Sequence, residues 1–148
     1  MEPMEWTTKS VDETHEAARK LIEMLEKKQN QATIVGLYGD LGSGKTTFVQ
    51  GVAKALGVRE TVISPTFIIE RVYKLEGYFR HFIHIDCYRF EDSNEIKTLG
   101  LDEVLKDPRA LLCIEWADKV EKFLPEGITK IYFELVDENT RKINIISV

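Results

Sequence analysis

The chain has 148 residues, a length that fits one domain (residues 1–148) built around one hydrophobic core. Hydrophobic residues make up 43% and charged residues 30% of the chain, a balance that excludes a disordered or membrane-spanning protein. The net charge is −5, and the basic pairs near the C-terminus, including Arg141 with Lys142, are interpreted as ordinary solvated faces. This acidic balance argues against direct tight binding of nucleic acid.

Two cysteines, Cys87 and Cys113, lie far apart and within apolar runs. Without the CxxC spacing of a zinc or redox site, they are predicted to be buried free thiols. The first eight residues contain no apolar stretch or cleavage signal, and no segment approaches the length of a membrane span. We therefore expect a cytoplasmic protein with no membrane partner.

The first predicted helix begins near Ser10. Ser10 is an N-cap residue, and Glu13 three positions later completes a capping box. Apolar residues then recur at helical spacing as far as Leu25, followed by two lysines that suit the negative end of a helix.

Residues 39–46 fit the phosphate-binding loop pattern of glycine, four residues and Gly-Lys-Ser/Thr. The apolar run at 32–38 predicts a buried strand before this loop, and apolar spacing over 46–56 predicts a helix after it. Lys45 would reach the β and γ phosphates, and the Thr46 hydroxyl would bind Mg²⁺. The residues expected to hold a nucleoside triphosphate are Gly39, Asp40, Leu41, Gly42, Ser43, Gly44, Lys45, Thr46 and Thr47. The first helix precedes this loop, so the segment 6–14 is expected either beside the bound base or as plain packing.

The remaining pattern predicts a sheet with few helical crossovers. Further strands are expected at 67–75, 79–85, 110–114, 128–136 and 141–148, and short helices after Asp92, near 102–106 and over 117–123. The pair 67–75 and 79–85 and the pair 128–136 and 141–148 are each predicted to form an antiparallel hairpin. We therefore predict an α/β, P-loop NTPase-like three-layer fold whose mixed sheet has a parallel core and antiparallel hairpins.

Two of the predicted strands end in a carboxylate, Asp86 and Glu115. Ligands of open α/β sheets lie outside the carboxyl ends of the parallel strands, so both side chains are expected near Thr46. One would hold Mg²⁺ or its water and the other would orient the attacking water, although either alone could be a solvated strand end. His84 shares the face of Asp86, where it could hydrogen-bond a metal-bound water or be a satisfied core group, and we favour the core group. Arg89 fits a phosphate or partner contact and a surface salt bridge equally well.

Five segments together resemble the TsaE (YjeE) family of small bacterial ATPases. They are Gly-Asp-Leu-Gly-Ser-Gly-Lys-Thr-Thr at 39–47, Ser-Pro-Thr-Phe at 64–67, His-Ile-Asp-Cys-Tyr-Arg at 84–89, Ile-Glu-Trp at 114–116 and Leu-Pro at 124–125. Their order and spacing match from the first helix to about Pro125, whereas the last hairpin matches only in character. Cys87 departs from the family, which more often has an aliphatic residue there; this should affect packing only.

The resemblance implies an ATPase that uses ATP and Mg²⁺ and supports threonylcarbamoyl modification of tRNA adenosine. It implies two protein partners, a TsaD-like transferase and a TsaB-like protein, and hydrolysis that sustains their turnover. Lys45 and Thr46 would hold phosphates and Mg²⁺, and Thr66 would reach the γ-phosphate from a switch-like loop. Asp86 would help to hold Mg²⁺. Glu115 would belong to the same metal site and would orient the attacking water, with Trp116 next to the site.

Other functions remain open at this point. The chain lacks an obvious arginine finger, so we predict weak hydrolysis that rises when partners order the 64–67 segment. A small-molecule kinase would use the same loop but would need an acceptor pocket and an arginine-bearing lid. A GTPase is disfavoured because the chain has no Asn-Lys-x-Asp run, and a nucleotide-dependent scaffold is the third alternative.

Overall fold

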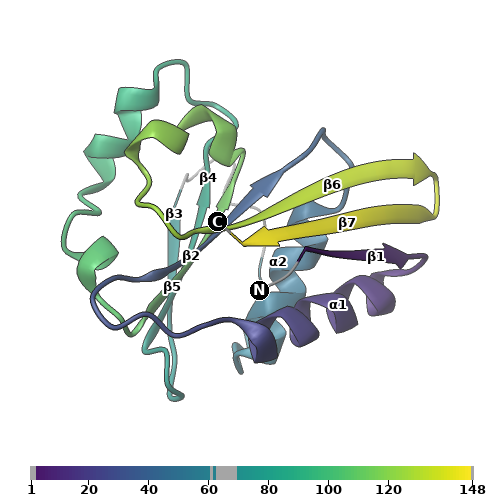
Figure 1. The fold of residues 1–148 in the computed structure, drawn as a ribbon, viewed down its shortest axis with the longest axis horizontal. Coiled ribbons are helices and arrows are strands. Elements are labelled where there is room, and N and C mark those ends of the chain that lie inside the picture. Colours follow the sequence, from purple (N-terminus) through teal and green to yellow (C-terminus); the bar gives the residue numbers. More distant parts are fainter. Residues whose placement is uncertain (1–2, 61, 63–69, 148) are drawn as a thin grey trace.

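The computed structural model describes residues 3–60, 62 and 70–147, and within them the chain forms one mixed sheet of seven strands in the order β1-β7-β6-β2-β5-β4-β3 (Figure 1). The strands are β1 (Met4–Thr8), β2 (Thr33–Tyr38), β3 (Glu70–Lys74), β4 (His81–Asp86), β5 (Ala110–Glu115), β6 (Thr129–Asp137) and β7 (Thr140–Ser147). The strands β6, β2, β5 and β4 run parallel to one another, and the outer strands pair antiparallel. The predicted mixed sheet with a parallel core is therefore confirmed, and β1 is an additional edge strand that the sequence did not predict.

Two α-helices form at the predicted places, α1 (Val11–Met24) and α2 (Lys45–Ala55). The Ser10 hydroxyl caps α1 by accepting a hydrogen bond from the Glu13 N–H, 3.1 Å away. The Glu13 carboxylate accepts from the N–H of Lys9, one residue before the cap, at 3.0 Å. The N-cap prediction is thus confirmed, while the return bond of the capping box is displaced by one residue.

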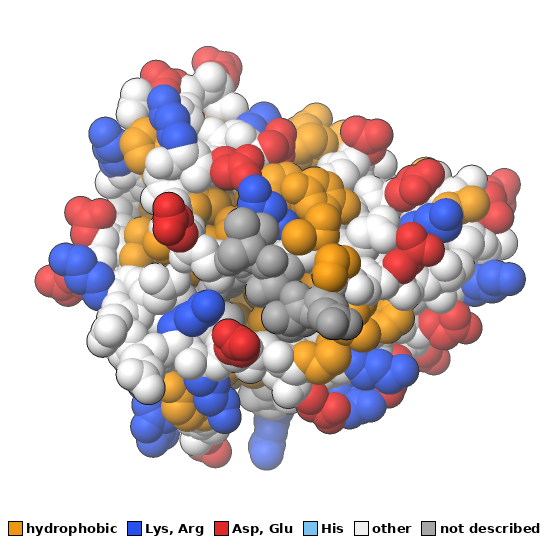
Figure 2. Space-filling model, viewed as in Figure 1, with side chains coloured by type: hydrophobic (Ala, Val, Ile, Leu, Met, Phe, Trp, Pro, Cys, Tyr) orange, Lys and Arg blue, Asp and Glu red, His pale blue; other side chains and the backbone are white. Residues whose placement is uncertain are grey.

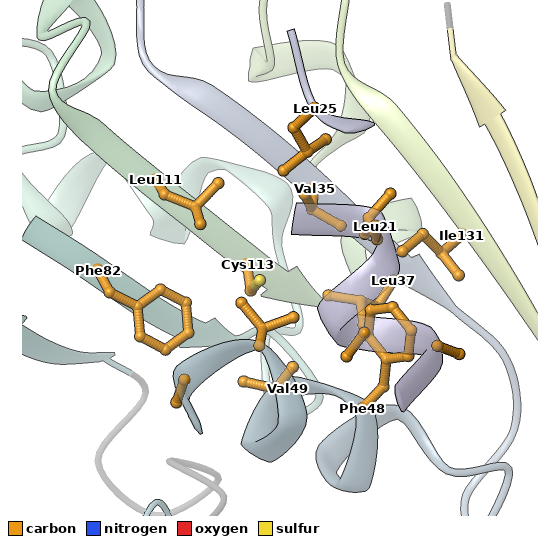
Figure 3. Packing of buried hydrophobic residues seen from close by; sticks show 14 of the residues in the cluster. Leu21, Leu25, Val35, Leu37, Phe48, Val49, Phe82, Leu111, Cys113 and Ile131 are labelled. Atoms are coloured by element: carbon orange, nitrogen blue, oxygen red, sulfur yellow. The ribbon is translucent and has the colours of Figure 1, made fainter. Parts of the chain in front are cut away.

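Both helices cover the same face of the sheet, and their apolar side chains interlock with those of the central strands (Figures 1 and 3). Leu21 of α1 lies beside Val35 of β2, and Phe48 and Val49 of α2 point toward the strands at Leu37 of β2 and Cys113 of β5. All six side chains are fully buried. This packing fixes α2, and with it the loop that precedes α2, against the carboxyl ends of the parallel strands.

The opposite face of the sheet is covered by short 3₁₀ segments. They are Ser93–Leu99, Val104–Lys106, Ala117–Lys119 and Glu121–Phe123, and they lie where the sequence predicted short helices. The first begins at Asp92 with a complete capping box to Glu95. The three-layer prediction is correct, but one outer layer consists of 3₁₀ turns and loops because these connections are short.

The surface charges and the buried cysteines agree with what the composition predicted. On the face drawn in Figure 2, acidic and basic side chains are interspersed, and no continuous basic area forms. Cys87 and Cys113 are buried and free, as predicted, and burial raises the pKa of both thiols, that of Cys87 to about 12. No helix in the described part of the chain is long and apolar enough to cross a membrane.

Candidate nucleotide site

The register of the parallel strands brings the predicted site residues to one edge of the sheet. Glu115 ends β5 beside Leu37 of β2 on one side and beside Asp86 of β4 on the other. Side chains alternate along a strand, so His84 shares the face of Asp86, which is the face that α2 covers. The loop between β2 and α2 passes directly over these strand ends.

The loop has the backbone that its glycines were expected to allow. Gly39, Gly42 and Gly44 have φ angles of 145°, 79° and 103°, which residues with a Cβ rarely adopt. At Gly39 space is also lacking: a Cβ would lie 2.7 Å from the backbone oxygen of Phe133 and 2.8 Å from Ser43 Oγ. Ser43 Oγ is buried and has no hydrogen-bond partner among the described residues. The loop thus presents an unpaired hydroxyl together with its glycine backbone, as a phosphate cradle would.

Lys45 is held inside the site. Its side chain is only 5% exposed, and its ammonium donates to the backbone oxygens of Gly39 and of Asp40, the latter at 3.1 Å. The same ammonium lies 4.0 Å from the ring centroid of Trp116. Burial lowers the pKa of Lys45, and the nearby carboxylates, with Glu115 the strongest, partly oppose that shift.

Glu115 is fixed from both sides. The Thr46 hydroxyl donates to Glu115 Oε1 at 2.9 Å, and His84 Nε2 lies 2.5 Å from Oε2. His84 is completely buried, as its interpretation as a core group requires, but its partner is the predicted water-orienting carboxylate. Its Nδ1 has no partner among the described residues. The imidazole and the hydroxyl therefore set the direction of the carboxylate.

Asp86 and Thr46 supply oxygen atoms of the kind that Mg²⁺ prefers. Asp86 is 4% exposed, and its Oδ1 accepts a hydrogen bond from the N–H of Tyr88 at 2.9 Å. Within the described ranges, no three His, Cys, Asp or Glu side chains gather as a metal cluster. A pair of protein oxygens is compatible with Mg²⁺, which takes few protein ligands and completes its shell with phosphate oxygens and water.

These groups line one pocket of about 400 Å³. The structure brings together the predicted residues 40–47, Asp86, Glu115 and Trp116. The end of β1, the start of α1 and the residues between them also line the pocket (residues 8–11 and 14), part of the segment expected near a base. Thr66, predicted to reach the γ-phosphate, lies outside the described residues, and Arg89 is exposed.

Some lining residues escaped the sequence analysis. They are Tyr88, Glu138, Asn139 and Arg141, and the last three belong to β7 or to the turn before it. The interpretation of Arg141 as a solvated face was wrong: the side chain is half-buried against Gly44. No local signal could have found it, because only the pairing of β7 with β1 and β6 brings that strand to the loop.

Trp116 has a left-handed backbone conformation, with φ 58° and ψ 41°. Within the described ranges it is the only residue other than glycine with a positive φ. Such a backbone costs about 1–3 kcal/mol and persists only where the surroundings enforce it. Here the conformation follows Glu115 directly and turns the indole toward Lys45 and toward Tyr88, whose ring centroid is 5.2 Å away. Strain is thus concentrated beside the candidate site.

Comparison with known proteins gives one consistent family. Residues 8–143 match the family model described as threonylcarbamoyl adenosine biosynthesis protein TsaE. A similar protein, the tRNA threonylcarbamoyladenosine biosynthesis protein TsaE of Bacillus subtilis (strain 168), is 37% identical over 148 residues, covering 100% of this chain and 88% of its own length. The protein of the same name from Rickettsia felis is 35% identical over 133 residues, 89% of this chain and 75% of the relative. The crystal structure of Bacillus subtilis YdiB superimposes with a TM-score of 0.78 at 28% identity, covering 99% of this chain and 86% of that one.

Proposed function

The chain belongs to the TsaE family, and from that premise we propose that it is a Mg²⁺-dependent ATPase that supports threonylcarbamoyl modification of tRNA adenosine. The observation that carries the proposal is the convergence of Lys45, Thr46, Asp86 and Glu115 on one pocket beside a glycine-rich loop. Each of these residue types has a defined task in phosphoryl transfer from a nucleoside triphosphate.

Different groups of the chain would bind the phosphates and the Mg²⁺ ion. Loop amides and the N-terminal end of α2 attract the phosphate tail, and Lys45 supplies a positive charge that its buried position strengthens. Thr46 and Asp86 would hold Mg²⁺, which supplies charge neutralisation of the phosphates when bound. The Lys45 ammonium, which donates to the carbonyl oxygens of Gly39 and Asp40, would exchange these bonds for bonds to phosphate oxygens.

Glu115 is the group proposed to orient the attacking water. Its Oε1 is engaged by Thr46 and its Oε2 by His84, so the carboxylate has one preferred direction before any ligand enters. Preorganisation of this kind lowers the reorganisation needed at the moment of reaction. Thr66 remains a proposed third contributor near the γ-phosphate.

The partners that the family implies are a TsaD-like transferase and a TsaB-like protein. A net charge of −5 favours binding to partner proteins over direct tight binding of tRNA by this chain. We expect slow hydrolysis by the isolated chain and faster hydrolysis with both partners present. Steady-state phosphate release with and without the two partners tests this, and an unchanged rate removes the partner-gated part of the proposal.

Nucleotide binding is tested by calorimetric titration with Mg²⁺ and ATP. Lys45→Ala should weaken binding by tenfold or more, because a buried cation that faces the phosphates is lost. Lys54→Ala is the matched control: it removes the same charge from an exposed position of the same helix and should bind normally. Failure of the unaltered chain to bind ATP, or equal effects of the two substitutions, would refute the proposal.

A screen of small hydroxyl compounds for phosphorylated products separates an ATPase from the alternative small-molecule kinase.

A further inference from the structure

The order of strands divides the candidate pocket into two ends. The phosphate loop follows β2, with β5 and β4 on one side and β6, β7 and β1 on the other. Asp86 and Glu115, the groups suited to Mg²⁺ and the attacking water, both lie on the first side. Neighbouring strands are about 4.8 Å apart, so β7 lies roughly 10 Å from β2 on the second side. A nucleotide with its β and γ phosphates at the carboxylate end therefore extends its nucleoside toward β7.

Arg141 occupies that second end. It pairs with Thr8 of β1 and with Leu135 of β6, so its backbone is held by a strand on each side. A Cβ at Gly44 would lie 3.7 Å from Arg141 Cγ and 3.8 Å from its Nε, so the side chain runs across the loop.

The guanidinium group is oriented by the turn between β6 and β7. Nη1 of Arg141 donates to the backbone oxygens of Asp137 at 3.1 Å, Glu138 at 3.3 Å and Thr140 at 3.4 Å. All three bonds start from one nitrogen, so they hold the guanidinium group beside this turn. A planar cation held in this way suits an aromatic ring.

We propose that Arg141 is a nucleotide-positioning residue whose guanidinium face packs against the base of the bound nucleotide. Hydroxyl and amide groups suited to a nucleoside, those of Thr8 and Asn139, line this end beside a further cation, Lys9. Lys45, the loop amides and Mg²⁺ already serve the phosphates. The inference rests on the proposed nucleotide site and adds the part of the chain that recognises the nucleoside.

The test compares ligands that share phosphates but differ in the nucleoside. Calorimetric titrations use ATP, ADP and inorganic tripolyphosphate, each with Mg²⁺. Arg141→Ala should weaken ATP and ADP by about tenfold, the size expected when a partly desolvated cation leaves an aromatic face, and should leave tripolyphosphate unchanged. Arg141→Lys keeps the charge but lacks the planar face, so it should resemble Arg141→Ala.

Lys142→Ala is the matched control because it removes one charge from the next residue of β7, whose side chain points to the opposite face of the sheet. It should bind all three ligands normally. A thermal unfolding curve for each variant identifies loss of fold, and if Arg141→Ala unfolds, Arg141→Lys alone decides.

Three results would overturn the inference. They are normal ATP binding by Arg141→Lys, a parallel loss of tripolyphosphate binding, and an equal effect of Lys142→Ala. The first means that charge alone suffices, the second that Arg141 acts on the phosphates, and the third that the effect is long-range. If the unaltered chain binds neither ATP nor tripolyphosphate, the proposed nucleotide site itself fails; if it binds both and Arg141→Lys changes neither, only this inference fails.

Discussion

Replacing Glu115 by Gln isolates the charge of the proposed water-orienting group from its size. Glu115 is 2% exposed, and its carboxylate lies between Thr46 Oγ1 and His84 Nε2. Glu115→Gln should lower the rate of ATP hydrolysis by roughly 10²–10⁴-fold, the usual contribution of a positioned general base. ATP binding should be kept or tightened, because a negative charge beside the phosphate tail is removed.

The same substitution has a calculable effect on stability. The amide oxygen of Gln can still accept the Thr46 hydrogen bond, but its NH₂ group then faces His84 Nε2. His84 must move its proton to Nδ1, a buried atom with no partner among the described residues. An unsatisfied buried donor costs about 1–3 kcal/mol, and release of the buried charge offsets part of it. At roughly 3 °C per kcal/mol, the melting temperature should fall by no more than about 10 °C.

The assay is phosphate release at saturating Mg²⁺ and ATP, with affinity from calorimetry and thermal unfolding on the same samples. Glu121→Gln is the matched control, because Glu121 is exposed and its partner is Lys130, away from the pocket. Hydrolysis by Glu115→Gln within twofold of the unaltered chain would show that the carboxylate does not orient the water. Loss of ATP binding in a folded variant would contradict the separation of binding from chemistry.

Three further predictions concern stability and reporters of the site. Gly51→Ala should destabilise the chain by about 1–3 kcal/mol, because the new Cβ would lie 2.8 Å from the backbone of α1. Chemical denaturation measures the free energy of unfolding, and equal or higher stability of the variant would mean that α1 and α2 can separate. Mg²⁺ and ATP should change tryptophan fluorescence through Trp116, so the signal should vanish in Trp116→Phe and persist in Trp6→Phe; the reverse pattern would place the ligand elsewhere. Cys87 and Cys113 should resist thiol reagents at pH 8 in the folded chain and react when it is unfolded, because the pKa of Cys87 is raised to about 12. Since the unfolded thiols ionise near 9, these raised pKa values also predict that the free energy of unfolding falls as pH rises above about 9.

Local chemistry allowed the sequence to predict the phosphate loop, the strand before it and the helix after it. The glycines at 39, 42 and 44 specify a backbone that other residues rarely adopt, and Ser10 specifies where α1 begins. Such signals depend on neighbours a few residues apart, so no tertiary information is needed to see them. Apolar runs that end in Asp86 and Glu115 likewise predicted two strands of a parallel core and the edge at which their carboxylates lie.

Sheet order and side-chain pairing were decided by the tertiary structure alone. Strand β1 gains its partner 130 and more residues away, where Met4 aligns with Ile145, and the same pairing carries Arg141 to the loop. The contact of His84 with Glu115 depends on the parallel register of β4 and β5, which a period-two pattern cannot specify between strands. Local pattern thus determined which chemical groups the chain has and where each element begins, whereas long-range strand pairing determined which of those groups meet, because pairing energy depends on partners that are distant in sequence.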